Sequence, residues 1–171
     1  MRIHAAALVV LVACSTAPAR TAPALTAAVG EYAPNATLVK VVDGDTIDVD
    51  IDGIEERVRL IGIDTPETKK PNTPVECFGP EASAFTTALL PVGTPLHLER
   101  DVEGRDKYQR LLAYVYLADG TFVNLEIVSR GYAHLLTIPP NVAHVDEFVS
   151  AARAAEAANT GLWGGCTGQH G

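Results

Sequence analysis

The sequence predicts a mainly β domain with α-helices, namely a five-stranded Greek-key barrel of the OB type with three helices packed on it. Five short segments carry the β-branched or alternating apolar pattern of strands, and three segments carry apolar residues at helical spacing. Their order along the chain, β-β-β-α-β-β-α-α, is typical of small closed barrels. An open antiparallel sheet would contain the same five strands, so the pattern leaves that alternative.

The expected strands cover residues 37–42, 46–51, 54–63, 96–102 and 110–117, and the expected helices cover residues 79–90, 122–130 and 142–158. Tight turns join the first three strands, because the Asp-Gly pairs at 43–44 and 52–53 are strong turn signals. Pro80 suits the first turn of the first helix, and Gly131 suits the end of the second. Residues 64–78 form a long loop, and ordered loops of that length are often functional.

The first 35 residues are expected to lie outside the barrel. Residues 1–13 begin with the basic Arg2 and continue as an apolar run too short to span a bilayer, which is typical of an export signal. The run ends in "LVAC", which resembles the lipobox of bacterial lipoproteins and indicates lipidation of Cys14. Residues 14–35, rich in Ala, Thr and Pro, predict a flexible tether. An ordinary secretory signal or a buried N-terminal helix are the alternatives.

These features predict a monomer that is exported and held, by its lipid anchor only, at the outer face of the cell membrane, in an extracellular or periplasmic position. The barrel domain then covers residues 36–166, and residues 167–171 form a short tail. Cys77 and Cys166 are expected to form a disulfide in an oxidising compartment. Two free thiols or a metal site are the alternatives, although no close Cys or His spacing supports zinc.

An acidic residue stands where the apolar pattern of the second strand points inward. Asp45 shares a face with Ile47, since side chains alternate along a strand, and burying an unpaired carboxylate is costly. Either the strand end opens to solvent or a cation lies beside it. Asp64, Thr65 and Glu67 follow the third strand, and hairpin pairing could bring them to the same rim. Such oxygen ligands favour Ca²⁺ or Mg²⁺, although each acidic residue singly also fits a turn or a solvated surface.

Two arginines add positive charge to this set. Arg59 lies within an otherwise apolar strand and Arg110 opens another. A guanidinium group donates paired hydrogen bonds to phosphate, although either arginine could instead pair with a structural carboxylate. Carboxylates for a cation together with two guanidinium groups form a phosphate-handling site, in which Glu67 could take a proton from water. The net charge of −8 argues against a non-specific DNA-binding protein but not against such a local site.

Several motifs occur in order over about residues 37–163, namely "VVDGDT", "VRLIGIDTPET", "FGPEASAF", "DKYQRLLAYVY" and "DGTFVN". Together they resemble the staphylococcal nuclease, or thermonuclease, family. The resemblance implies an OB-fold, Ca²⁺-dependent phosphodiesterase that cleaves DNA and RNA to 3′-phosphate products. It implies calcium binding by Asp45, by Asp64 and by the carbonyl of Thr65, with Glu67 as the general base.

The resemblance also assigns residues to the substrate. Arg59 and Arg110 match the two phosphate-binding arginines of the family. Lys107 and Tyr108 match residues beside a terminal phosphate of bound nucleotide. These four residues would contact nucleic acid directly.

Three positions bear on how strongly nucleic acid would bind. Gln109 replaces a glycine that is usual in the family, which we expect to alter its loop without removing a catalytic group. Thr137 stands where an aromatic residue would stack on a base, so affinity is expected to be weaker unless Tyr132 compensates. The basic pair Lys69 and Lys70 could guide a nucleic-acid strand or be merely solvated.

Two other functions fit the pattern, a non-catalytic OB-type module that binds nucleic acid or protein, and a lipoprotein with a purely structural cation site. Degenerate domains of this kind typically lose acidic or arginine positions, and here all of them are present. In the metal-free protein, mutual repulsion is expected to raise the pKa of at least one of Asp45, Asp64 and Glu67.

Overall fold

The structure is a computed structural model that describes residues 32–68 and 74–166. Its barrel strands are β1 (Ala36–Asp43), β2 (Thr46–Ile51), β3 (Ile54–Leu60), β5 (Pro95–Glu99) and β6 (Leu111–Leu117). They close into a barrel in the order β1-β2-β3-β6-β5, in which only the β3–β6 pair is parallel. The predicted closed barrel is therefore confirmed, and the open-sheet alternative is excluded.

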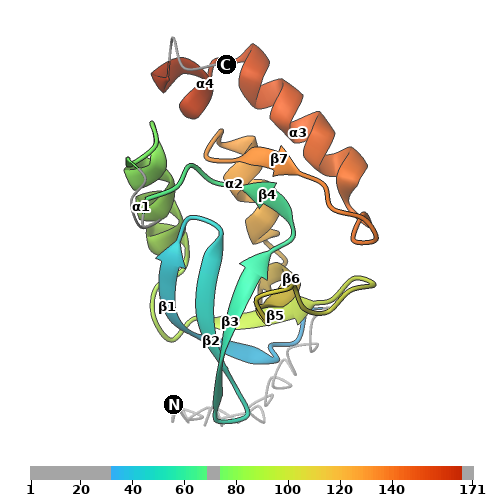
Figure 1. Ribbon diagram of the computed structural model, residues 1–171. Coiled ribbons are helices and arrows are strands. Elements are labelled where there is room, and N and C mark those ends of the chain that lie inside the picture. The colour runs from blue at the N-terminus through green and yellow to red at the C-terminus, as the bar shows by residue number, and fades with distance from the viewer. Residues whose placement is uncertain (1–31, 69–73, 167–171) are drawn as a thin grey trace, which may run out of the picture.

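The remaining elements are the strands β4 (Gly62–Asp64) and β7 (His134–Leu136) and the helices α1 (Gly79–Leu89), α2 (Val123–Ser129), α3 (Val145–Ala157) and α4 (Leu162–Gly165). The three predicted helices are confirmed to within a few residues, whereas β7 and α4 were not predicted. Figure 1 shows α3 and α4 at the opposite end of the molecule from the β2–β3 hairpin. Among the residues described, no helix has the length and apolar character needed to cross a bilayer.

The predicted third strand, residues 54–63, is wrong at its end, because the chain breaks into β3 and β4. Gly62, the first residue of β4, adopts φ 84°, a left-handed conformation that interrupts the extended backbone, and the ring of Phe148 fills the space where its Cβ would stand. From this glycine on, the chain leaves the barrel, and β4 pairs with β7 instead. Asp64, the last residue of β4, is thereby carried to the mouth of the barrel.

Apolar residues fill the barrel on the faces that alternation predicts. Ile47 and Val49 of β2 and Val58 of β3 are fully buried. A buried amide fixes the β3–β4 junction, because Asn124 of α2 donates to the Ile61 carbonyl at 2.9 Å. Its side-chain oxygen also accepts from a backbone N–H of β6 at 3.0 Å. The β3–β4 junction is therefore fixed both by apolar packing and by the hydrogen bonds of the buried Asn124 amide.

A disulfide links the segment before α1 to the residue after α4. Cys77 and Cys166 are bonded, with their Cα atoms 5.9 Å apart, so the free-thiol and metal alternatives do not hold. The predicted export signal (1–13), the lipidation site Cys14 and the tail (167–171) lie outside the described residues, as does most of the predicted tether (14–35). Those predictions remain predictions.

Candidate active site

Asp45, the residue immediately before β2, is buried, as its place in the apolar pattern predicts, with 7% of its surface exposed. Its carboxylate accepts hydrogen bonds from the Thr65 backbone N–H at 2.8 Å and from the Thr46 hydroxyl at 2.9 Å. Arg59 Nη2 lies 3.1 Å from the oxygen that Thr65 also contacts. The positive charge of Arg59 thus reduces the free-energy cost of burying the Asp45 carboxylate.

Arg59 ties the end of β3 to β4. Its Nη1 donates to the carbonyls of Leu60 and Ile63, at 2.7 Å each, and its Nη2 donates to Asp64 Oδ1 at 2.7 Å. Only 12% of the arginine side chain is exposed, against 56% of that of Asp64. One guanidinium nitrogen therefore contacts both Asp45 and Asp64, so these two carboxylates are neighbours.

A fixed carboxylate positions Arg110, which precedes β6. Asp106 accepts hydrogen bonds from Arg110 Nε at 2.7 Å and from the backbone N–H groups of Arg110 and Tyr108 at 3.0 and 2.9 Å. Burial opposes ionisation of Asp106, but these hydrogen bonds outweigh it and lower its pKa. Sequence reasoning missed this residue, although its position four residues before the arginine was a signal.

Tyr108 presents its ring at the surface between two cations. Its residue surface is 68% exposed, with Lys107 Nζ 5.0 Å and Arg110 Cζ 5.5 Å from the ring centroid. Such cation–π contacts orient an otherwise free aromatic ring. Lys107, Tyr108 and Arg110, which the sequence predicted to contact phosphate, therefore lie together, with the two cations beside the tyrosine ring.

Two acidic residues that sequence reasoning did not assign lie beside Glu67. Glu76 accepts the backbone N–H of Glu67 at 3.0 Å, and Asp43 lies close enough for its carboxyl group to interact with that of Glu67. Burial raises the pKa of Asp43, hydrogen bonds from Thr68 and Gly44 oppose the shift, and Glu67 adds to it. Asp43 was interpreted only as a turn residue, but its place two residues before Asp45 brings it to the same rim.

A single cleft of about 660 Å³ contains all the predicted catalytic, metal-binding and substrate-binding residues that the structure describes. They are Asp45, Arg59, Asp64, Thr65, Glu67, Lys107, Tyr108 and Arg110. The parallel pairing of β3 with β6 explains why residues far apart in sequence meet here, since it brings the start of β6 beside the end of β3. Lys69 and Lys70 lie outside the described residues, so their proximity to the cleft stays a prediction.

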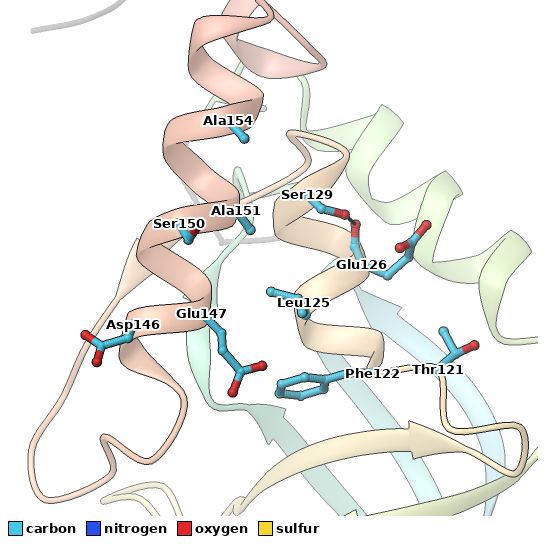
Figure 2. A pocket seen from close by; sticks show the side chains of 10 residues that line it. All are labelled: Thr121, Phe122, Leu125, Glu126, Ser129, Asp146, Glu147, Ser150, Ala151 and Ala154. Carbon is cyan, nitrogen blue, oxygen red and sulfur yellow. Dashed lines mark hydrogen bonds between the residues drawn. The ribbon is translucent and has the colours of Figure 1, made fainter.

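A second groove, of about 790 Å³, lies between α2 and α3 (Figure 2). Figure 2 shows Leu125 on α2 and Ala151 on α3 lying across this groove from each other. The charged residues that line it are Glu126, Asp146 and Glu147, all acidic. Its lining contains no lysine or arginine to contact a phosphate, whereas the cleft at the barrel mouth contains Arg59 and Arg110, so that cleft is the candidate site.

Comparison with known proteins relates the chain to enzymes that cleave nucleic acid, which fits the phosphate-binding groups in the cleft. The family model described as staphylococcal nuclease homologue matches residues 57–165, well over half of the chain. The chain belongs to the staphylococcal nuclease family. It is 46% identical to a thermonuclease of Staphylococcus intermedius, covering 72% of this chain and 73% of that relative. It is 40% identical to a thermonuclease of Staphylococcus hyicus (74% and 73% covered) and to the endonuclease YncB of Bacillus subtilis (75% and 61% covered).

The departures from the staphylococcal nuclease pattern have visible consequences. Gln109 adopts φ 66°, the left-handed conformation that a glycine takes easily, and still accepts a hydrogen bond from Arg105 through its carbonyl at 2.7 Å. The suggestion that Tyr132 compensates for Thr137 is wrong. The ring of Tyr132 stacks on Phe85, with centroids 4.3 Å apart, and does not line the cleft.

The expected rise in an acidic pKa occurs at Asp64, although the main cause differs from the prediction. Loss of hydration in the cleft raises the pKa of Asp64, Arg59 lowers it, and repulsion from Asp45 raises it further. Mutual repulsion is thus a smaller contribution than burial. Because water reaches much of the Asp64 side chain, its charge is well screened.

The donor set fits a hard cation of the kind that the staphylococcal nuclease family uses. Asp43, Asp45, Asp64 and Glu67 line the cleft and present only oxygen, which is the ligand type that Ca²⁺ and Mg²⁺ prefer. Within residues 32–68 and 74–166, no three His, Cys, Asp or Glu side chains converge as a metal centre. Asp45 and Asp64 instead share Arg59, so the carboxylates have the right chemistry while their negative charge is partly neutralised by the arginine.

Proposed function

We propose that the protein is a calcium-dependent nuclease that hydrolyses phosphodiester bonds of DNA and RNA and leaves 3′-phosphate ends. The observation that carries the proposal is the joining of Arg59, Arg110 and a set of carboxylates in one cleft. Membership of the staphylococcal nuclease family supports it, as do relatives named thermonuclease and endonuclease. The groups required for phosphate recognition and for proton removal are both present.

The proposed reaction is attack of water on phosphorus with loss of the 5′-oxygen, since that bond must break if the phosphate stays on the 3′ side. Arg59 and Arg110 would donate hydrogen bonds to the phosphate oxygens and stabilise the charge that grows on them. Glu67 would accept the proton of the attacking water. Lys107 and Tyr108 would hold a neighbouring phosphate at the edge of the cleft.

Asp45, Asp64 and the carbonyl of Thr65 would hold the calcium ion. Bound there, calcium supplies positive charge that neutralises the scissile phosphate. Asp64 is the more adaptable ligand, because its side chain is 56% exposed whereas that of Asp45 is 10% exposed. Arg59 would exchange part of its contact with these carboxylates for contact with the substrate.

We also propose that the nuclease acts as an exported, lipid-anchored monomer. The sequence pattern of an export signal at residues 1–13 and the resemblance of "LVAC" to a lipobox ending in Cys14 support this location. The disulfide supports it independently, because such bonds persist mainly in oxidising compartments. Globomycin, which blocks removal of lipoprotein signals, should retain the longer precursor, and unchanged processing would contradict the proposal.

The test is the release of acid-soluble nucleotides from single-stranded DNA by the purified protein with Ca²⁺, Mg²⁺ or EDTA. We expect release with Ca²⁺, none with EDTA, and loss of release in Arg59→Ala. Arg57→Ala is the matched control, because Arg57 lies two residues away on the same strand and pairs with Asp48 outside the cleft. No release with any metal would overturn the proposal.

A second pair of variants distinguishes a nuclease from a non-catalytic module that only binds nucleic acid or protein. Glu67→Gln should abolish cleavage because it removes the group that accepts the proton of water. Nucleic-acid binding should be unchanged, because the positively charged side chains that contact phosphate remain. Glu81→Gln, on the exposed surface of α1, is the control for loss of one acidic charge. Unchanged cleavage in Glu67→Gln would contradict the role of Glu67.

A further inference from the structure

Glu67 is held from across its loop by Glu76. The Glu67 N–H donates to the Glu76 carboxylate at 3.0 Å, and the Glu76 N–H donates back to the Glu67 carbonyl at 3.0 Å. These reciprocal bonds join the two residues through the main chain of Glu67. The position of the Glu67 backbone therefore depends on where residue 76 stands.

The start of α1 packs against the same stretch. A Cβ on Gly79 would stand 2.8 Å from Thr68 Cγ2, 3.0 Å from the Pro66 carbonyl oxygen and 3.1 Å from that of Glu67. There is thus no free space between residues 66–68 and the first residue of the helix. A shift of the segment that leads into α1 would be transmitted to Glu67.

The disulfide fastens this segment to the interior of the C-terminal region. Cys77 follows Glu76 directly and is bonded to Cys166, which is 8% exposed. The Cys166 N–H donates to the carbonyl of Leu162, a residue with 1% exposure, whose own N–H donates to the Gly131 carbonyl at 2.8 Å. Glu76 is thus one residue from a covalent link to a buried, hydrogen-bonded anchor.

Apart from that link, the ring of Phe78 packs on Tyr132 and on Gly165, whereas Glu76 itself has only hydrogen bonds to the described residues. Glu76 is exposed, and hydrogen bonds that compete with water contribute only modestly to stability. Phe78, the next residue after Cys77, has φ 68°, a conformation that is unfavourable for a side chain larger than glycine. Glu76 therefore has only exposed hydrogen bonds and stands two residues before a strained backbone position, and the disulfide at Cys77 opposes relaxation at this point.

We propose that the Cys77–Cys166 disulfide and Glu76 form one clamp that positions Glu67, so that the nuclease reaches full activity only when the disulfide is formed. Glu76 is in this view a positioning residue, and the proposal rests on the proposed role of Glu67 as the base. Because disulfides form where thiols become oxidised, cleavage would be coupled to the compartment in which the chain matures. The structure of the barrel itself would not require the clamp.

The first test is independent of catalysis. Amide hydrogen exchange is compared in the full protein and in Cys77→Ser/Cys166→Ser, at a temperature where circular dichroism shows both to be folded. We expect the Glu67 and Glu76 amides to exchange at least tenfold faster in the variant than in the parent, relative to the amides of α2. Equal acceleration of α2 would indicate global destabilisation and would overturn the clamp, as would no change at residues 67 and 76.

The second test measures cleavage kinetics. We expect kcat of the double-serine variant to fall about tenfold with KM unchanged, because substrate binding relies on the arginines and not on Glu67. Leu96→Ala, which opens a cavity in the barrel away from the cleft, serves as the control of comparable or greater instability. An equal fall in kcat for this control, or no fall in the double-serine variant, would overturn the proposal. If even the parent does not cleave DNA, the proposed function fails while the exchange measurement still decides the clamp.

The third test isolates Glu76. Glu76→Ala removes the acceptor of the Glu67 N–H and should reproduce the fall in kcat with the disulfide intact. Glu76→Gln retains a carbonyl oxygen at the same place and should restore at least half of the parent activity. Equal activity of the alanine variant and the parent would contradict a positioning role for Glu76.

Discussion

Two arginines of β3, Arg57 and Arg59, differ in how they pair with carboxylates. On the outside of the barrel, Arg57 contacts both oxygens of Asp48, with Nε and Nη2 at 2.7 and 3.0 Å. Lys40 Nζ lies 3.0 Å from the same carboxylate, which is 3% exposed. Two positions further along, Arg59 faces two carboxylates with one nitrogen. On the outside, one carboxylate is therefore shared by two cations, whereas in the cleft one guanidinium is shared by two carboxylates.

The pKa shifts of the two carboxylates also differ in direction. The hydrogen bond from Arg57 lowers the pKa of Asp48, burial opposes the shift, and Lys40 adds to the lowering. In the cleft, burial raises the pKa of Asp64 in spite of Arg59. A completed ion pair leaves nothing to bind a further ion, while a cleft with surplus negative charge can take a cation. The comparison suggests that unsatisfied charge, and not the mere presence of arginine and aspartate, marks the functional cluster.

The largest expected effect is the difference between the two arginines in catalysis. Arg59→Ala should lower kcat by about 10²–10³-fold, the usual cost of removing one group that stabilises transition-state charge. Arg57→Ala should change it by less than about threefold, because Arg57 does not line the cleft. Initial rates on single-stranded DNA at saturating Ca²⁺ measure both. Similar losses in the two variants would break the distinction between the clusters.

The next effect concerns stability on the outer face. Asp48→Asn should lower the free energy of unfolding at pH 7 by about 1–3 kcal/mol, because it replaces charge-assisted hydrogen bonds at a buried position. A lowered pKa means that this stabilisation is present above the ordinary Asp pKa of 3.8 and is lost as pH falls through the lower folded value. Urea unfolding at pH 7 and pH 3 measures it. A difference that does not shrink at pH 3 would contradict the assignment to charge.

A smaller effect of opposite sign is expected in the cleft. Asp43→Asn should slightly stabilise the metal-free protein at pH 7, by less than about 1 kcal/mol because the group is half-exposed and water screens it. Its raised pKa means that the folded state loses stability as pH rises from 3.8 through the higher folded value. Thermal unfolding in EDTA at pH 7 and pH 3 checks this, and the gain should vanish at pH 3. Destabilisation at pH 7 would contradict the raised pKa of Asp43.

Periodicity and turn residues predicted the barrel because its strands obey alternation, as in β2, whose bounds were predicted correctly. They did not predict the break at Gly62, since that depends on the ring of Phe148 packing from α3. The site residues were predicted from motifs, but their partners were not. Asp106 and Glu76 act through side-chain hydrogen bonds that exist only once the loops are placed. Such hydrogen bonds between loop residues produce no repeating pattern in the sequence, so periodicity could not predict them.

The smallest expected effect tests whether the loop between the two clusters serves stability or catalysis. Gln109 has φ 66°, and its carbonyl accepts from Arg105, which is paired with Glu56 on the outer side at 2.7 Å. Gln109→Gly relieves a left-handed conformation that costs about 1–2 kcal/mol. The greater freedom of glycine in the unfolded chain offsets roughly 0.5–1 kcal/mol of this gain. Urea unfolding should therefore show a net stabilisation of a few tenths of a kcal/mol, with kcat unchanged, because Asp106 still holds Arg110. A fall in kcat would show that the strained residue itself positions the cleft arginine, and the separation between the outer and inner clusters would then be incomplete.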